Sequence, residues 1–148
     1  MSSFKAEPIE ADFLLIAEDN PADVGLIQLA LRTHGISAPK LHIVQDGEAA
    51  IRFIEQLEAD STPCPSLAIF DLNLPRIGGD QVLRRLRASE KWRSVPVIIV
   101  SSSLSPRDRE DAIGLGASAY FSKPSDLEQF LELGSLIKIV LLAQQRTE

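Results

Sequence analysis

Short apolar runs alternate along the chain with segments in which apolar residues recur every three or four positions. The runs have the length of buried strands, and the segments that follow them have the periodicity of amphipathic helices. Five such pairs predict a parallel sheet with right-handed crossovers and helices on both faces. The strands are expected at 13–17, 41–44, 67–70, 95–100 and 119–122.

Helix starts between these strands support the alternation. Asn20-Pro21 and Ser105-Pro106 each place a capping residue before a proline at the first helical position. Ser125 to Glu128 has the form of a capping box, which opens a last helix that reaches about Gln144. We expect an α/β fold with the flavodoxin-like strand order 2-1-3-4-5. Residues 1–12 are interpreted as an N-terminal tail, and 13–145 as one domain.

The overall composition narrows the class of function. Lys and Arg number 15 against 21 Asp and Glu, a net charge of −6, which argues against the basic surface that nucleic-acid binding needs. The one cysteine, Cys64, can form no internal disulfide. The N-terminus lacks the apolar core of a signal peptide, and the longest apolar stretch, near 136–143, is too short to span a bilayer. We expect a cytoplasmic protein that binds neither nucleic acid nor membranes.

Acidic residues follow two of the predicted strands. Glu18 and Asp19 come after the first strand, and Asp71 comes after the third. In the order 2-1-3-4-5 these strands are neighbours, so the three carboxylates should meet at the carboxyl edge of the sheet, where ligands bind in this fold class. Three crowded acids repel one another unless a cation lies among them. Mg²⁺ fits best, because it prefers oxygen ligands and needs only one or two carboxylates plus phosphate oxygens.

Ser101 follows the fourth strand and Lys123-Pro124 follows the fifth. Together with the acids, this five-point pattern resembles the receiver domain of two-component response regulators, over essentially residues 13–142. Three local runs match as well: Glu-Asp-Asn-Pro-Ala-Asp from position 18, Asp-Leu-Asn-Leu-Pro from 71 and Gly-Ala-Ser-Ala-Tyr-Phe-Ser-Lys-Pro from 116. They are most similar to stand-alone receivers that partner phytochrome-type or other hybrid histidine kinases.

The resemblance implies a role for each residue of the acidic site. Asp71 matches the phosphoacceptor, which forms an aspartyl phosphate. Asp19 is expected to bind Mg²⁺ directly and Glu18 partly through water, with Asp71 and the backbone carbonyl of Asn73 as further ligands. Lys123 matches the lysine that pairs with the acceptor carboxylate or its phosphate. The resemblance also implies a cis peptide bond before Pro124.

The resemblance to receiver domains further implies a conformational switch on phosphorylation. Ser101 would bind the new phosphate, and Tyr120 would turn inward, which changes the face built from the fourth helix, the fifth strand and the last helix. Asn73 and Ser103 match positions that tune how fast the acyl phosphate hydrolyses. Gly79 matches a glycine that gives the backbone room in the loop after Asp71.

The expected partners are a sensor histidine kinase and, downstream, a phosphotransfer or effector protein of a phosphorelay. The last helix is apolar nearly all round at its end, which favours burial on two sides and suggests a homodimer. Packing of Phe4 and Ile9 against the domain is the alternative explanation for those apolar residues.

Two other functions compete with the phosphorylation switch. A receiver-like scaffold could bind partners without phosphorylation, although all the acids and the lysine are present here. A phosphatase could also use an aspartyl phosphate, but Asn73 stands where such enzymes place a second acid. We therefore expect no enzyme beyond the domain's own phosphorylation and dephosphorylation. Cys64, His34 and His42 are interpreted as structural.

Overall fold

The computed structural model describes residues 9–38 and 40–146. Five parallel strands form its central sheet in the order β4-β2-β5-β6-β7, which confirms the predicted topology and flavodoxin-like fold class. These strands are β2 (Leu14–Ala17), β4 (Leu41–Val44), β5 (Leu67–Asp71), β6 (Val97–Ser101) and β7 (Ala119–Ser122).

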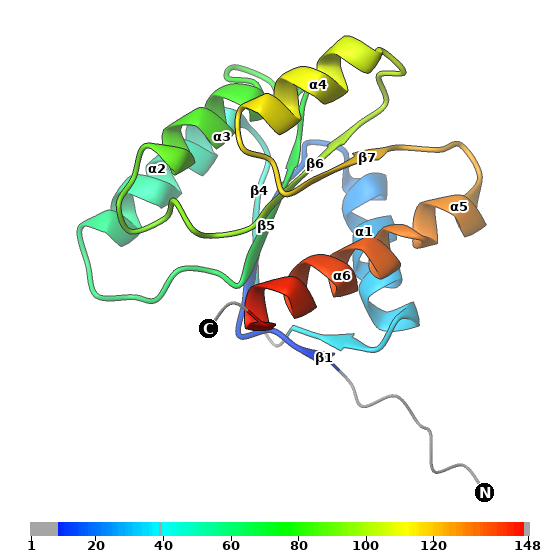
Figure 1. Cartoon of the computed structure of the whole chain (residues 1–148), viewed down its shortest axis with the longest axis horizontal. Helices are drawn as coiled ribbons and strands as arrows, with labels where there is room; N and C mark the ends of the chain where they lie inside the picture. The colour runs from blue at the N-terminus through cyan, green and yellow to red at the C-terminus, as the bar shows by residue number, and fades with distance from the viewer. Residues whose placement is uncertain (1–8, 39, 147–148) are drawn as a thin grey trace, which may run out of the picture.

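Helices cover both faces of the sheet (Figure 1). On one face lie α2 (Gly47–Glu58), α3 (Gly79–Arg87) and α4 (Pro106–Gly114), and on the other lie α1 (Pro21–Thr33), α5 (Leu127–Leu131) and α6 (Leu133–Arg146). Every residue of β2, β5 and β6 is buried, as expected for central strands covered on both sides. Each face therefore has its own hydrophobic cluster.

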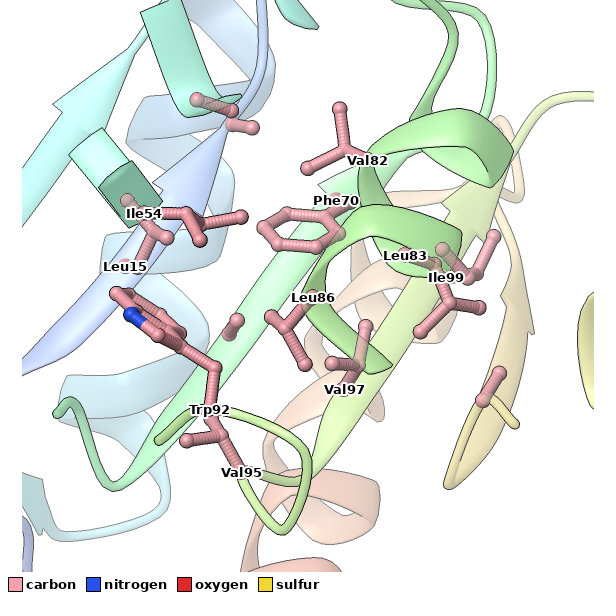
Figure 2. Close-up of a cluster of buried hydrophobic side chains, with 14 of the residues drawn as sticks. Leu15, Ile54, Phe70, Val82, Leu83, Leu86, Trp92, Val95, Val97 and Ile99 are labelled. Atoms are coloured by element: carbon pink, nitrogen blue, oxygen red, sulfur yellow. The ribbon is translucent and has the colours of Figure 1, made fainter. Parts of the chain in front are cut away.

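The cluster under α2 and α3 is built around large side chains (Figure 2). Phe70 of β5 lies against Val82 and Leu83 of α3, and the indole of Trp92 closes the lower end of the cluster. Trp92 and Phe70 are fully buried. This packing fixes β5, and with it the position of the acid at the end of that strand.

The start of α1 agrees with the prediction from the sequence, whereas the start of the last helical segment differs from it. The side chain of Asn20 accepts a hydrogen bond from the backbone N–H of Ala22 at 2.9 Å, as an N-cap should. In the last helical segment Asp126, not Ser125, is the N-cap, so the predicted capping box is wrong. Aspartate caps as well as serine does, and two adjacent candidates cannot be separated by spacing alone. The predicted single last helix is also divided, with Glu132 between α5 and α6.

Part of the segment that we assigned to an N-terminal tail is a strand. β1 (Ile9–Glu10) pairs in parallel with β3 (Ile36–Ser37) in a separate two-stranded sheet. Both strands have two residues, too few for a periodic pattern to reveal them. Ile9 packs against the α1 side of the core, while Phe4 lies outside the described residues.

The expected cis bond before Pro124 is also wrong. No peptide bond among the described residues is cis, so Lys123 joins Pro124 in the trans form. The two isomers of a bond that precedes proline differ by only about 0.5–1 kcal/mol, so sequence similarity alone does not fix the choice. No helix within residues 9–38 and 40–146 is long and apolar enough to cross a membrane.

Gly79 and Gly134 each allow a close approach between chain segments. A Cβ atom built on Gly79, at the start of α3, would overlap the backbone carbonyl oxygen of Asp71. This agrees with the expectation that Gly79 provides room beside that residue. A Cβ on Gly134 would overlap the ring of His34, so α6 packs closely against the end of α1 there. His34 therefore has a packing role.

We predict that Gly79→Ala lowers the free energy of unfolding by about 1–3 kcal/mol, because the added methyl group has no space. Gly25→Ala is the matched control, since a Cβ on this exposed residue of α1 meets nothing within 4 Å. That control should stabilise the protein by about 0.5–1 kcal/mol. Urea unfolding of the two variants tests the pair, and equal effects would contradict the steric explanation.

Candidate functional site

The carboxyl ends of four strands meet at one edge of the sheet. Asp71 and Ser101 are the last residues of β5 and β6, whereas Glu18 and Asp19 directly follow β2. Lys123 directly follows β7. The parallel register pairs Ala17 with Phe70 and Ser101 with Ser122, which puts all these chain segments at the same level. The site therefore follows from strand order and register.

Three carboxylates of this edge form a candidate metal centre. Glu18, Asp19 and Asp71 each offer one oxygen, and these oxygens lie within 4.8 Å of one another. Glu18 and Asp71 are buried, whereas Asp19 is exposed. A set of hard oxygen ligands with one open side suits Mg²⁺, which keeps several waters. It is also the only such cluster of His, Cys, Asp and Glu in the described part of the chain, so neither histidine nor Cys64 belongs to one.

Lys123 is bound by three carboxylates at once. Its Nζ atom donates to Glu18 Oε1 at 2.7 Å, to Asp23 Oδ2 at 2.9 Å and to Asp71 Oδ2 at 3.0 Å. The lysine side chain is only 11% exposed. A buried ammonium is tolerated when its hydrogen bonds are all made, and here three acceptors match its three donors. Burial alone lowers the pKa of Lys123, but the bonds to the three carboxylates raise it above its ordinary value, so the lysine stays charged.

The electrostatics of Glu18 differ from those of an ordinary carboxylate. Burial raises its pKa from 4.5 to about 7, the hydrogen bond from Lys123 opposes this rise, and the charge of Asp71 adds to it. The burial of Glu18 thus outweighs its salt bridge. A second positive charge near Glu18, such as a divalent cation, would favour its ionised form.

Sequence reasoning missed Asp23 as a member of this site. We included it only as the last acid of the run that begins at Glu18 and assigned it no role in the site. Since α1 begins at the same edge of the sheet as the other acids, its first turn can reach the site, and that position was the available signal. The structure joins Asp23 to Lys123, one hundred residues further along the chain.

Local hydrogen bonds orient Asp71 and Ser101. The backbone N–H of Asn73 donates to Asp71 Oδ1 at 2.9 Å, which leaves Oδ2 to Lys123. Ser101 Oγ accepts from the backbone N–H of Ser103 at 3.0 Å. No hydrogen bond donated by the Ser101 hydroxyl is found among the described residues, so its proton is available to a ligand.

In the part of the chain that the structure describes, neither the Ser103 nor the Tyr120 hydroxyl is hydrogen-bonded to a carboxylate of the candidate metal centre. The hydroxyl of Ser103 donates to Asp108 of α4 at 2.6 Å and accepts from the backbone N–H of Ser105 at 3.1 Å. Tyr120 is buried in the cluster on the α4 side of the sheet. Its hydroxyl has no hydrogen-bond partner among the described residues, which is costly for a buried polar group. The buried position of Tyr120 therefore leaves its hydroxyl without a hydrogen bond to any described residue, which is unfavourable.

Comparison with known proteins decides the family. The profile described as "Response regulator receiver domain" matches residues 14–133. The chain belongs to this family. The match covers all five strands of the central sheet and every site residue named above. Receiver domains are phosphoacceptors of two-component signalling rather than enzymes, and they interact with sensor histidine kinases and downstream effectors.

Relatives of this receiver include proteins of similar length. The response regulator Rcp1 of Synechocystis sp. is 31% identical over 121 residues, which are 81% of this chain and 82% of Rcp1. The probable methanogenesis regulatory protein FilR2 of Methanothrix harundinacea is 29% identical over 90% of this chain and 86% of its own length. The resemblance to stand-alone, phytochrome-associated receivers is thus confirmed.

Solved structures show the same fold with metal or phosphate bound. The Mn²⁺-bound form of Rcp1 superposes with a TM-score of 0.75 at 30% identity, over 86% of this chain and 91% of that one. Phosphorylated RcpA, a cyanobacterial phytochrome response regulator, gives 0.77 at 28% identity, over 88% and 94%. The receiver domain of the kinase PA1611 from Pseudomonas aeruginosa, with magnesium in its active-site cleft, gives 0.67 at 28% identity, over 88% and 97%.

The raised pKa of Glu18 predicts a pH dependence of stability in the absence of divalent metal. In the unfolded chain Glu18 loses its proton near pH 4.5, whereas in the folded protein it keeps the proton to about pH 7. The folded state binds more protons in this window, so its free energy of unfolding should fall as pH rises through it. Urea unfolding in EDTA at pH 5 and pH 8 measures this loss.

Glu18→Gln is the control, because it removes the titrating group and should flatten this part of the pH dependence. Added Mg²⁺ should also reduce the loss, since it pairs with the ionised carboxylate. The assignment to Glu18 is wrong if the variant in EDTA shows the full loss seen in the wild-type protein.

Proposed function

We propose that this receiver takes a phosphoryl group from the phosphohistidine of a sensor histidine kinase onto Asp71 in a Mg²⁺-dependent reaction. The observation that carries the proposal is the position of Asp71, which lies between a metal-binding set of acids and the ammonium of Lys123. The phosphorylated and metal-bound relatives support it.

The bond changes in this transfer balance. A carboxylate oxygen of Asp71 bonds to phosphorus as the phosphorus–nitrogen bond of the phosphohistidine breaks, and the released imidazole takes up a proton. The Asn73 N–H and Lys123 hold the carboxylate in a fixed orientation for this attack. Lys123 is also within reach of a phosphoryl group on Asp71, which it contacts as a point charge.

Glu18, Asp19, Asp71 and the backbone carbonyl of Asn73 are the proposed protein ligands of the metal. The cation, when bound, neutralises negative charge on the transferred group. Asp19 is the exposed member and so offers direct ligation, while the burial of Glu18 beside Lys123 suits a contact through water. Asn73 and Ser103 are proposed to tune hydrolysis of the acyl phosphate.

Phosphorylation is proposed to switch the face formed by α4, β7 and α6. The free proton of Ser101 can be donated to a phosphate on Asp71, and this shift would affect the neighbouring Tyr120, whose buried hydroxyl lacks a partner. In this way a new charge on Asp71 would change the conformation of the surface formed by α4, β7 and α6.

The same face carries exposed apolar side chains. Ile139 and Leu142 of α6 are 64% and 41% exposed, and Ile113 of α4 is 47% exposed. We propose that they form a homodimer contact in signalling. The description of RcpA as a cyanobacterial phytochrome response regulator supports a kinase of the phytochrome type as the phosphodonor, with a phosphotransfer or effector protein downstream. The net charge of −6 supports a role that does not involve nucleic acid.

The proposed phosphorylation of Asp71 predicts a single phosphoryl adduct in intact-mass spectra after incubation with Mg²⁺ and acetyl phosphate. Asp71→Asn and a sample in EDTA should both remain unmodified, because they lack the acceptor and the metal. An adduct that persists in Asp71→Asn would place the acceptor elsewhere. No adduct in the wild-type protein with acetyl phosphate, phosphoramidate or a histidine kinase would favour the phosphorylation-independent scaffold.

The proposed homodimer can be tested in solution. Sedimentation equilibrium at high micromolar concentration should show a dimer, and Ile139→Lys should shift it to monomer by placing a charge in the apolar contact. Leu127→Lys is the matched control, since Leu127 is an exposed leucine of α5 outside this face. A monomer with and without phosphorylation would contradict the dimer, as would equal effects of the two variants.

A further inference from the structure

Asp23 contacts Lys123 as closely as the acceptor does. The distance from Lys123 Nζ is 2.9 Å to Asp23 Oδ2 and 3.0 Å to Asp71 Oδ2. The Asp23 side chain is 21% exposed and that of Lys123 is 11% exposed, so water screens this ion pair less than an ordinary surface pair. The contact joins the first turn of α1 to the segment after β7.

The three acceptors of Lys123 come from three different parts of the chain. Glu18 follows β2, Asp71 ends β5 and Asp23 belongs to α1. An ammonium on a flexible four-carbon side chain has no preferred direction of its own, so its position depends on its partners. With Asp23 absent, the two remaining acceptors would be the acids that also lie in the candidate metal centre. Asp23 is therefore the partner that keeps its place when a cation occupies that centre.

We propose that Asp23 is a positioning residue for phosphoryl transfer, which holds the Lys123 ammonium on the side of Asp71 where the phosphoryl group arrives. The inference rests on the proposed function and goes beyond it by assigning a role to an acid that makes no contact with the reacting atoms. The main alternative explanation is that Asp23 only adds negative charge at the start of α1.

The two explanations predict changes in different kinetic parameters for Asp23→Asn. Loss of a negative charge alone weakens the repulsion of an anionic phosphodonor, so it lowers the donor concentration for half-maximal rate and leaves the maximal rate unchanged. A misplaced ammonium instead lowers the maximal rate constant at saturating donor and Mg²⁺. We expect a decrease of about three- to tenfold, the size of the net contribution of one ordinary hydrogen bond, because the asparagine amide can still accept a weaker hydrogen bond from Lys123.

The experiment measures the rate of adduct formation against acetyl phosphate concentration, at saturating Mg²⁺, for the wild type, Asp23→Asn, Lys123→Met and the double variant. If Asp23 acts through Lys123, Asp23→Asn should have no further effect in the Lys123→Met background. Glu48→Gln is the matched control. Glu48 is a first-turn acid of α2 that pairs with Arg76 and not with Lys123, so it tests the loss of one charge alone.

The outcomes separate this inference from the function on which it rests. An unchanged maximal rate in Asp23→Asn, or additive effects in the double variant, overturns the positioning role while the adduct on Asp71 still stands. Absence of any adduct in the wild type overturns both. Circular dichroism and urea unfolding of each variant verify that the rates compare folded proteins.

Discussion

The rest of the site depends on one interaction, the binding of the Lys123 ammonium by carboxylates from three chain segments. Ionised groups are expensive to bury, and breaking a buried pair costs more than forming it contributes, because the remaining charge loses its partner. Three acids, Glu18, Asp23 and Asp71, share this one lysine, and Asp19 adds a fourth carboxylate close to Glu18 and Asp71. Burial is the main reason why the pKa of Glu18 is raised, and the charge of Asp71 adds to it. The excess negative charge explains why this edge of the sheet suits a divalent cation.

Such a crowded arrangement requires a rigid support. Three of the strands that end at the site, β2, β5 and β6, are buried along their whole length, with separate hydrophobic clusters on the two faces of the sheet. Gly79 lets α3 start against the backbone of Asp71, so even the carbonyl next to the acceptor is packed. Close-packed interiors yield little to strain. The carboxylates therefore cannot separate to relieve their repulsion, and neutralisation by a cation is the response that the fold leaves open.

The central sheet and its acids could be predicted because both depend on local patterns. An apolar run followed by an acid locates a strand end, and strand order then brings distant ends together. The bond between Asp23 and Lys123 is different, since it depends on the direction in which the first turn of α1 points, and no periodicity encodes that. The division of the last helix at Glu132 and the pairing of β1 with β3 were likewise set by tertiary contacts, which can override local propensity.

One hydrogen-bonded connection leads away from Asp71, a second begins at Ser101 at the end of the neighbouring strand β6, and the two reach opposite layers of the fold. Lys123 connects Asp71 to Asp23 of α1, whereas Ser101 is bonded to Ser103, which is bonded in turn to Asp108 of α4. A phosphoryl group on Asp71 would offer new acceptor oxygens to both Lys123 and the Ser101 hydroxyl, so each connection would have to adjust. Because α1 and α4 cover different faces of the sheet, one covalent change at its edge can bias the packing on both.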